Sequence, residues 1–187
     1  MGDLLPQFQR VGCDLFSRGL VSSHSGNISI RTGEQLIITR RGSMLAHLTE
    51  QDLVKTGIDR NDEATPLAST ELSVHRAIYK QTSALAIVHA HPPHAIALSL
   101  VENEIVPLDM EGCLLVPKVP VLAWNMKLKP GELGEEVSLA LGQNRIIILH
   151  GHGTFALGQT LEEAYHWTSA LEESCHIIYL LQTVKGG

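Results

Sequence analysis

Residues 85–93 read Leu-Ala-Ile-Val-His-Ala-His-Pro-Pro, an apolar run that ends in two histidines and is stopped by two prolines. A short apolar run of this kind predicts a buried β-strand. Side chains at positions i and i+2 of a strand point to the same face, so His89 and His91 would project together from its end. Two imidazoles placed in this way suit two metal ligands. The alternative is a pair of polar residues at a strand end that faces water.

A second apolar strand has the same kind of ending. Residues 146–153 read Ile-Ile-Ile-Leu-His-Gly-His-Gly, and the glycines allow the backbone to bend closely after the strand. Two such strand ends, side by side, would bring three histidines to one point, and three protein nitrogens with one open position are usual for a catalytic zinc. His150 and His152 are neighbours on one face, so the spacing leaves open which of them is the third ligand. Either one could instead be a polar residue at the end of the strand.

Helices and further strands surround these two segments. Helical spacing of the apolar residues predicts helices over 4–20, 69–82, 94–101, 131–142 and 160–184. Further strands are expected at Ile28–Arg31, Leu36–Thr39 and Val119–Leu122. The hairpin-like turn at Glu34-Gln35 favours a mixed or largely antiparallel sheet over a doubly wound parallel one. The 187 residues contain no internal repeat, linker or low-complexity tract, so we expect one α/β domain over residues 1–187.

The composition excludes several classes of protein. The formal net charge is −6 with 14 lysines and arginines, and aromatic residues make up 4%, so we expect no nucleic acid and no membrane surface as partner. No stretch reaches the roughly 18 apolar residues of a membrane span, and the first residues lack the pattern of a signal peptide. Cys13, Cys113 and Cys175 are widely spaced and form no CxxC pair. This pattern indicates a reducing compartment and a cytoplasmic protein.

A carboxylate and several anion-binding groups complete the candidate site. Glu71 falls at the start of the predicted helix 69–82, where it is either a general base beside a metal or a simple stabiliser of the helix dipole. His75 follows one turn later and could serve only as a partner of Glu71. Glycine turns and helix starts bind anions, although each one also fits ordinary turn or cap chemistry. The chain offers such groups at Gly26, Asn27, Gly42, Ser69 and Thr70.

Five short motifs occur in an order that resembles a known family. They are SGNIS at 25–29, ITRRG at 38–42, STE at 69–71, HAH at 89–91 and HGHG at 150–153. Together they resemble the class II aldolase and adducin family over nearly the whole chain, and most closely its short L-fuculose-1-phosphate aldolases. The resemblance implies a three-layer α/β/α fold around a mainly antiparallel sheet. It also implies a C4 homotetramer with the site near the subunit boundary.

The resemblance implies a role for each candidate residue. His89, His91 and His152 match the zinc ligands of the family, which favours His152 over His150. Glu71 matches the acid/base glutamate, which can also bind the resting metal. Mn²⁺ or Co²⁺ could replace Zn²⁺, since geometry and availability select the metal. Arg41 stands where some relatives carry threonine, and the implied phosphate pocket consists of Gly26, Asn27, Gly42, Ser69 and Thr70.

The implied reaction is the reversible cleavage of a ketose 1-phosphate, such as L-fuculose 1-phosphate, into dihydroxyacetone phosphate and an aldehyde through a metal-stabilised enediolate. Two alternatives on the same metal site are a methylthioribulose-1-phosphate dehydratase and a ribulose-5-phosphate 4-epimerase. A third is a non-enzymatic adducin-like scaffold, which the presence of the three histidines and Glu71 disfavours.

One segment departs from the family. Aldolases of this type carry a tyrosine after the HxH pair, where this chain reads VPLDMEG at 106–112, with Glu111 near that position.

Overall fold

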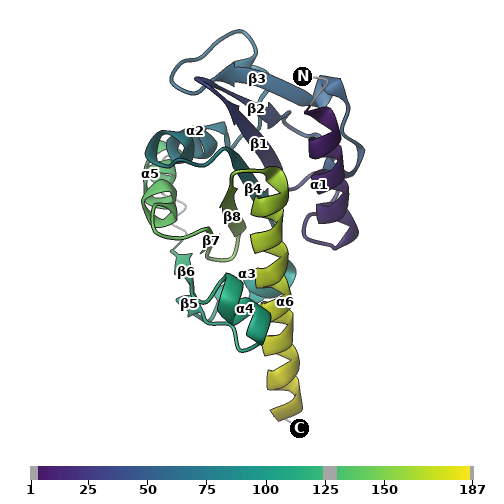
Figure 1. Ribbon diagram of the computed structural model, residues 1–187, viewed down its shortest axis with the longest axis vertical. Helices are drawn as coiled ribbons and strands as arrows, with labels where there is room; N and C mark the ends of the chain where they lie inside the picture. Colours follow the sequence, from purple (N-terminus) through teal and green to yellow (C-terminus); the bar gives the residue numbers. More distant parts are fainter. Residues whose placement is uncertain (1–3, 124–129, 186–187) are drawn as a thin grey trace.

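A computed structural model describes residues 4–123 and 130–185, which form an eight-stranded sheet between two layers of helices (Figure 1). The strands lie in the order β3-β2-β1-β4-β8-β7-β6-β5. Neighbouring strands are antiparallel except for the parallel pair β6 and β7. The strands are β1 (Asn27–Thr32), β2 (Gln35–Thr39), β3 (Leu53–Gly57), β4 (Ala86–Ala90), β5 (Glu104–Ile105), β6 (Val119–Leu122), β7 (Ile146–Leu149) and β8 (Gly153–Gly158).

Helices cover both faces of the sheet, and each face has its own apolar core (Figure 1). One face carries α2 (Leu72–Gln81) and α5 (Pro130–Leu141). The other face carries α1 (Leu5–Ser17), α3 (Pro93–Ser99), α4 (Met110–Leu115) and α6 (Leu161–Lys185). Three single turns of 3-10 helix are η1 (Leu45–His47), η2 (Glu50–Asp52) and η3 (Thr65–Leu67). The predicted three-layer α/β/α fold with a mainly antiparallel sheet is confirmed.

Alternation along β4 decides which face of the sheet carries the site. Val88 points into the core beneath α1 and α6, whereas Ile87 points into the core beneath α2 and α5. Because strand side chains alternate with a period of two, His89 faces the same side as Ile87 and therefore α2. All five residues of β4 are buried, which explains why its sequence is almost continuously apolar.

The register of the central strands gathers three segments of the chain at one edge of the sheet. Asn27, at the start of β1, lies opposite His89 near the end of β4. On the other side of β4, Ala90 lies opposite Thr154 near the start of β8. Because these strands are antiparallel, the start of β1, the end of β4 and the start of β8 meet at the same edge.

The structure also contains elements that the sequence did not predict, namely β3, β5, β8 and α4. The predicted helices and strands lie close to their expected bounds. The most consequential omission is β8, which separates β4 from β7, so the two histidine-bearing segments are not adjacent strands. Within the described ranges, no helix combines the length and apolarity that crossing a bilayer requires. The single-domain organisation over residues 1–187 stays a prediction.

Gly12 sets how closely α1 approaches η1. A Cβ atom at position 12 would lie 2.2 Å from the carbonyl oxygen of Leu45, far inside contact distance. We predict that Gly12→Ala lowers the free energy of unfolding by about 1–3 kcal/mol, because overpacking against the backbone outweighs the helix preference of alanine. Urea denaturation measures the change. Cys13→Ala, at the exposed next position, is the control and should shift stability by less than about 0.5 kcal/mol. Equal stability of Gly12→Ala and the wild type would contradict the packing.

Candidate active site

Three histidines converge at the edge where β1, β4 and β8 meet. His89 is the penultimate residue of β4, His91 follows the strand, and His152 lies in the tight turn that joins β7 to β8. The Nε2 atom of His89 lies 3.0 Å from Nε2 of His91 and 3.3 Å from Nε2 of His152. Their three ligand nitrogens all lie within 4.8 Å of one another, which is the arrangement that a metal ion needs.

His89 is held in one tautomer. Its Nδ1–H donates to the carbonyl oxygen of Thr154 at 2.8 Å, so its Nε2 carries a lone pair toward the other two histidines. Phe155 stacks on the imidazole with ring centroids 4.2 Å apart, which fixes the plane of the ring. Burial lowers the pKa of His89, and burial together with His89 and His152 lowers the pKa of His91 to about 4. Both rings are therefore neutral at physiological pH and able to bind a metal.

The donor set fits a tetrahedral metal ion. Zinc–nitrogen bonds of about 2.0–2.1 Å place two ligand nitrogens about 3.3–3.4 Å apart on a tetrahedral edge. The separations of His91 and His152 from His89, 3.0 and 3.3 Å, come close to this value before any ion draws the rings into place. The sequence left open His150 or His152 as the third histidine. The structure brings His152 into the cluster, whereas the side chain of His150 is exposed.

Glu71 lies against the same histidines. Its Oε2 is 3.1 Å from Nε2 of His89, and its Oε1 is 3.3 Å from Nε2 of His152. Glu71 is the N-cap residue of α2, yet its side chain makes no capping hydrogen bond, so the helix dipole alone does not explain its position. Burial opposes ionisation of the carboxyl, but the adjacent His89 and hydrogen bonds from His152 and Asn27 outweigh it and hold the pKa of Glu71 well below its usual range. The carboxylate is therefore ionised.

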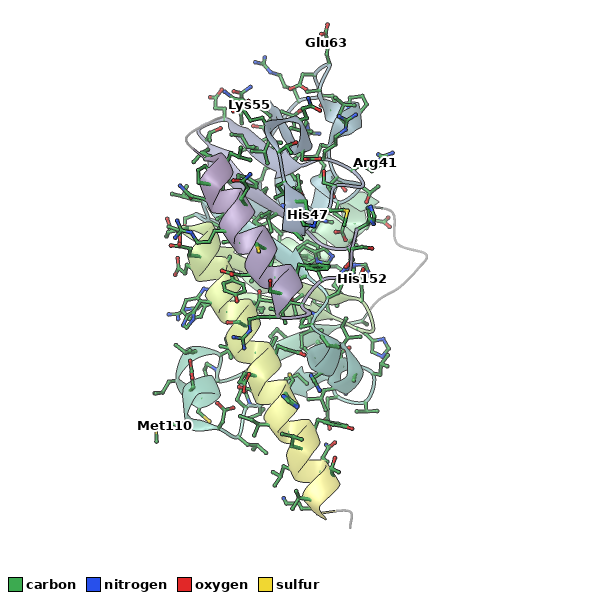
Figure 2. The ribbon with its side chains drawn as sticks, turned by 90° about the vertical axis from the view of Figure 1, so that its right-hand side faces the viewer. Arg41, His47, Lys55, Glu63, Met110 and His152 are labelled. Atoms are coloured by element: carbon green, nitrogen blue, oxygen red, sulfur yellow. The ribbon has the colours of Figure 1, made fainter. Side chains whose placement is uncertain are left out.

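One cavity of about 230 Å³ contains the whole predicted site. Arg41 and His152 lie on the same side of the molecule (Figure 2), and both line this cavity. The nine residues predicted as metal ligands, acid/base and phosphate pocket all line it: Gly26, Asn27, Gly42, Ser69, Thr70, Glu71, His89, His91 and His152. The structure thus brings together groups from five separate motifs.

Further basic residues line the same cavity and were not part of the predicted site. They are His24 and Arg40, which line it together with Arg41. Both arginine side chains are exposed, so they offer their charge to a ligand in the cavity rather than to the core. The signal in the sequence was the pair of basic residues directly before a glycine turn. Glu111, by contrast, lies on α4 and lines a different cavity with Arg18 and Glu173.

Two of the predicted anion-binding residues, Gly26 and Asn27, also contribute to the structure of the site. Gly26 adopts a φ of +75°, and a Cβ atom there would lie 2.8 Å from the carbonyl oxygen of His89, so only glycine fits this close approach. The side chain of Asn27 holds two neighbours, since its Nδ2 donates to Glu71 and its Oδ1 accepts from His75. Asn27 also lines the cavity, so its predicted place in an anion-binding pocket stays a prediction.

Comparison with known proteins places the chain in a family. The family model described as Class II Aldolase and Adducin N-terminal domain matches residues 7–179. The fold is that of a class II aldolase, and three of the described histidines could hold a metal ion. The chain belongs to the class II aldolase and adducin family.

Individual relatives agree with this assignment. A protein named L-fuculose phosphate aldolase from Methanococcus maripaludis is 31% identical, over 91% of this chain and 93% of that protein. A protein named 3-oxo-tetronate 4-phosphate decarboxylase from Pectobacterium atrosepticum is 29% identical, over 92% of this chain and 82% of its own. The crystal structure of L-fuculose-1-phosphate aldolase from Thermus thermophilus is 38% identical, covers 100% of this chain and 98% of its own, and superposes with a TM-score of 0.93.

The choice between the two histidines of the β7–β8 turn can be tested directly. We predict that His152→Ala abolishes stoichiometric zinc binding, because it removes one of three converging nitrogens. His150→Ala, two residues away and exposed, is the matched control and should keep full zinc content. Metal analysis of the zinc-loaded, desalted variants measures both. Full zinc in His152→Ala would show that the ligand set is wrong.

Buried neutral histidines make the fold sensitive to acid. Burial lowers the pKa of His75 to about 3, and burial and nearby histidines lower that of His91 to about 4, both from 6.5. Below about pH 6.5 the unfolded chain binds protons that the folded chain does not, so stability falls steadily as the pH is lowered toward about 4. Urea unfolding of the metal-free protein across this range measures the fall, which should be smaller in His75→Gln. A pH-independent stability would contradict the assignment of neutral rings.

Proposed function

We propose that the protein is a metal-dependent aldolase that reversibly cleaves a ketose 1-phosphate, such as L-fuculose 1-phosphate, into dihydroxyacetone phosphate and an aldehyde. The observation that carries the proposal is the contact of the ionised Glu71 with the histidine cluster in a cavity that also holds anion-binding groups. The relatives named L-fuculose phosphate aldolase, 30% and 31% identical over more than nine-tenths of the chain, support it.

We assign His89, His91 and His152 as ligands of Zn²⁺, which Mn²⁺ or Co²⁺ could replace. When bound, the ion supplies a Lewis acid that polarises the substrate carbonyl and stabilises the charge of an enediolate. Neutral imidazoles are suited to this task because they leave the positive charge of the ion undiminished. Among the described residues that line the cavity, Glu71 supplies the carboxylate charge.

We assign proton transfer at the reacting carbon to Glu71. In the cleavage direction it delivers a proton to the carbon that becomes the hydroxymethyl group of dihydroxyacetone phosphate, and in the synthetic direction it removes that proton. Its carboxylate lies against the histidines and lines the cavity, so it is within reach of a bound substrate. The same carboxylate can bind the metal when no substrate is present, since both of its oxygens face histidine nitrogens.

We assign the phosphate group to Gly26, Asn27, Gly42, Ser69 and Thr70, which line the same cavity. Ser69 and Thr70 precede α2, and Gly42 follows β2, so hydroxyl and backbone N–H groups border the same space. Arg40 and Arg41, whose side chains are exposed, add positive charge there. Anchoring the phosphate there would hold the reacting carbon near Glu71 and convert binding energy into orientation.

Other reactions on a phosphorylated sugar fit the same edge of the sheet. The relatives named 3-oxo-tetronate 4-phosphate decarboxylase favour loss of CO₂ as the second candidate, because that step also leaves an enolate next to a polarised carbonyl. A dehydratase or a 4-epimerase would use the same ligands. An adducin-like scaffold is the non-enzymatic alternative, and failure to bind any metal would favour it.

The expected C4 homotetramer and the cytoplasmic location belong to this proposal. Exposed apolar side chains gather on the segment from α3 to α4, and Met110 projects from it with 82% exposure (Figure 2). The Cδ2 atom of Leu100, in this group, lies 3.1 Å from where a Cβ of Gly151 would be, so the apolar surface begins beside the site. This continuity supports self-association near the histidines. The group comprises Leu100, Val101, Val106, Leu108, Met110 and Leu114.

A substrate panel tests the reaction. The zinc-loaded protein is incubated with ketose 1-phosphates, including L-fuculose 1-phosphate, and with a 3-oxo-tetronate 4-phosphate. We expect release of dihydroxyacetone phosphate that a chelator abolishes. Release of CO₂ alone would identify the decarboxylase, and loss of water without carbon–carbon cleavage would identify the dehydratase.

Proton transfer by Glu71 can be tested separately. Glu71→Gln should bind a full complement of zinc and lose about 10²–10⁴-fold in kcat, because the amide keeps the shape of the side chain but no longer accepts the proton. Glu63→Gln is the control, since Glu63 is exposed at the far end of the molecule (Figure 2). Turnover that is unchanged in Glu71→Gln would remove Glu71 from the mechanism.

A further inference from the structure

A row of buried polar side chains lies behind Glu71. Asn27 Nδ2 donates to Glu71 Oε2 at 2.6 Å, and Asn27 Oδ1 lies 2.6 Å from His75 Nε2. On the far side of the ring, His75 Nδ1 lies 2.7 Å from the hydroxyl of Ser29, which in turn lies 2.8 Å from the hydroxyl of Tyr79. His75 and Ser29 are completely buried and Tyr79 is 1% exposed, so these groups have no contact with solvent.

Two elements hold this row in place. Glu71, His75 and Tyr79 are spaced four residues apart at the start and along one side of α2, and such residues face the same direction. Asn27 and Ser29 are two residues apart on β1 and point to the same face of the sheet. The two sets alternate along the row, with Asn27 between Glu71 and His75, and Ser29 between His75 and Tyr79.

The chemistry of these groups allows one direction for the hydrogen bonds. Burial lowers the pKa of His75 to about 3, so the ring is neutral and has one N–H and one lone pair. Because the amide nitrogen of Asn27 faces the Glu71 carboxylate, its carbonyl oxygen faces His75, which must donate from Nε2. Nδ1 then accepts from Ser29, and Ser29 accepts from Tyr79, whose hydroxyl proton is retained because burial raises its pKa.

The opposite arrangement would disturb the carboxylate. If His75 carried its proton on Nδ1, its Nε2 lone pair would oppose the Asn27 oxygen, and the amide would have to turn over. The Asn27 oxygen would then lie against Glu71 Oε2 at hydrogen-bond distance without a proton between them. The hydroxyls of Ser29 and Tyr79 can each donate or accept, so the carboxylate of Glu71, which only accepts, sets the direction of the row.

We propose that His75 is a positioning residue for the reaction: it holds the amide of Asn27 with its NH₂ group toward Glu71, and the hydrogen bond to Ser29 holds the His75 ring from its other side. The inference rests on the proposed function for the role of Glu71. Neither His75 nor Tyr79 lines the cavity that holds Glu71, so they act on the substrate only through Asn27 and the carboxylate.

Kinetics of matched variants test the role. His75→Phe keeps an aromatic ring without nitrogens, whereas His75→Gln keeps a neutral N–H donor that can reach Asn27. We expect His75→Phe to lower kcat by about 10–100-fold with unchanged zinc content and a KM within about twofold of the wild type. His75→Gln should recover most of the lost kcat. Wild-type kcat in a folded His75→Phe, or no recovery in a folded His75→Gln, would overturn the proposal.

A second measurement needs neither activity nor a variant with wild-type stability. In zinc-loaded wild-type protein labelled with ¹⁵N-histidine, NMR of the ring nitrogens reports the tautomer of each histidine. We expect one ring other than the zinc ligands to be neutral with its proton on Nε2 and to exchange that proton slowly near neutral pH, assigned to His75 by its loss in His75→Gln. A His75 ring protonated on Nδ1 or on both nitrogens would overturn the proposal. If the wild type cleaves no sugar phosphate, the proposed function fails, while this measurement still decides the direction of the hydrogen bonds.

Discussion

The hydrogen bond from His89 to the carbonyl oxygen of Thr154 is the interaction on which the rest of the site depends. It joins β4 to β8 through a side chain as well as through the backbone ladder, and it turns the lone pair of His89 Nε2 toward His91, His152 and Glu71. With the proton on the other nitrogen, His89 would present an N–H to the metal position and could not act as a ligand. The fold thus leaves a lone pair on Nε2 of His89, and this atom lies between His91, His152 and Glu71.

Burial sets the charge states of the residues at the edge where β1, β4 and β8 meet. Ionisable rings that are taken out of water favour their neutral form, so His75, His89 and His91 all have lowered pKa values. The pKa of Glu71 is lowered as well, but for a carboxyl group this favours the charged form, because hydrogen bonds and the adjacent histidines outweigh the effect of burial. The result is one carboxylate among neutral donors, an arrangement that attracts a cation and leaves a base within reach of it. Arginines at the rim of the same cavity supply the charge for an anionic group.

Much of this could be predicted from the sequence, for identifiable reasons. The apolar runs before His89 and His150 mark strands whose ends project side chains, and local glycines mark the turns. The strand β8 was missed because it starts inside the HGHG motif and is bounded by Gly153 and Gly158, so it shows no separate apolar run. Its position between β4 and β7 is a matter of long-range pairing, which spacing along the chain does not encode.

The partners of His75 could not be predicted from the sequence either, because its position one turn from Glu71 suggested a direct pair. Its ring contacts Asn27 and Ser29 instead, since β1 inserts these two side chains along α2.

We propose that this edge of the sheet removes a proton from a carbon next to the carbonyl of a phosphorylated ketone. The most direct test is deuterium exchange into dihydroxyacetone phosphate in D₂O, followed by proton NMR with the zinc-loaded protein and no aldehyde present. We predict that one hydrogen of the hydroxymethyl group is replaced by deuterium, and that the metal-free protein does not catalyse the replacement. Zinc-loaded, folded protein that binds dihydroxyacetone phosphate without exchanging that hydrogen would contradict this mechanism.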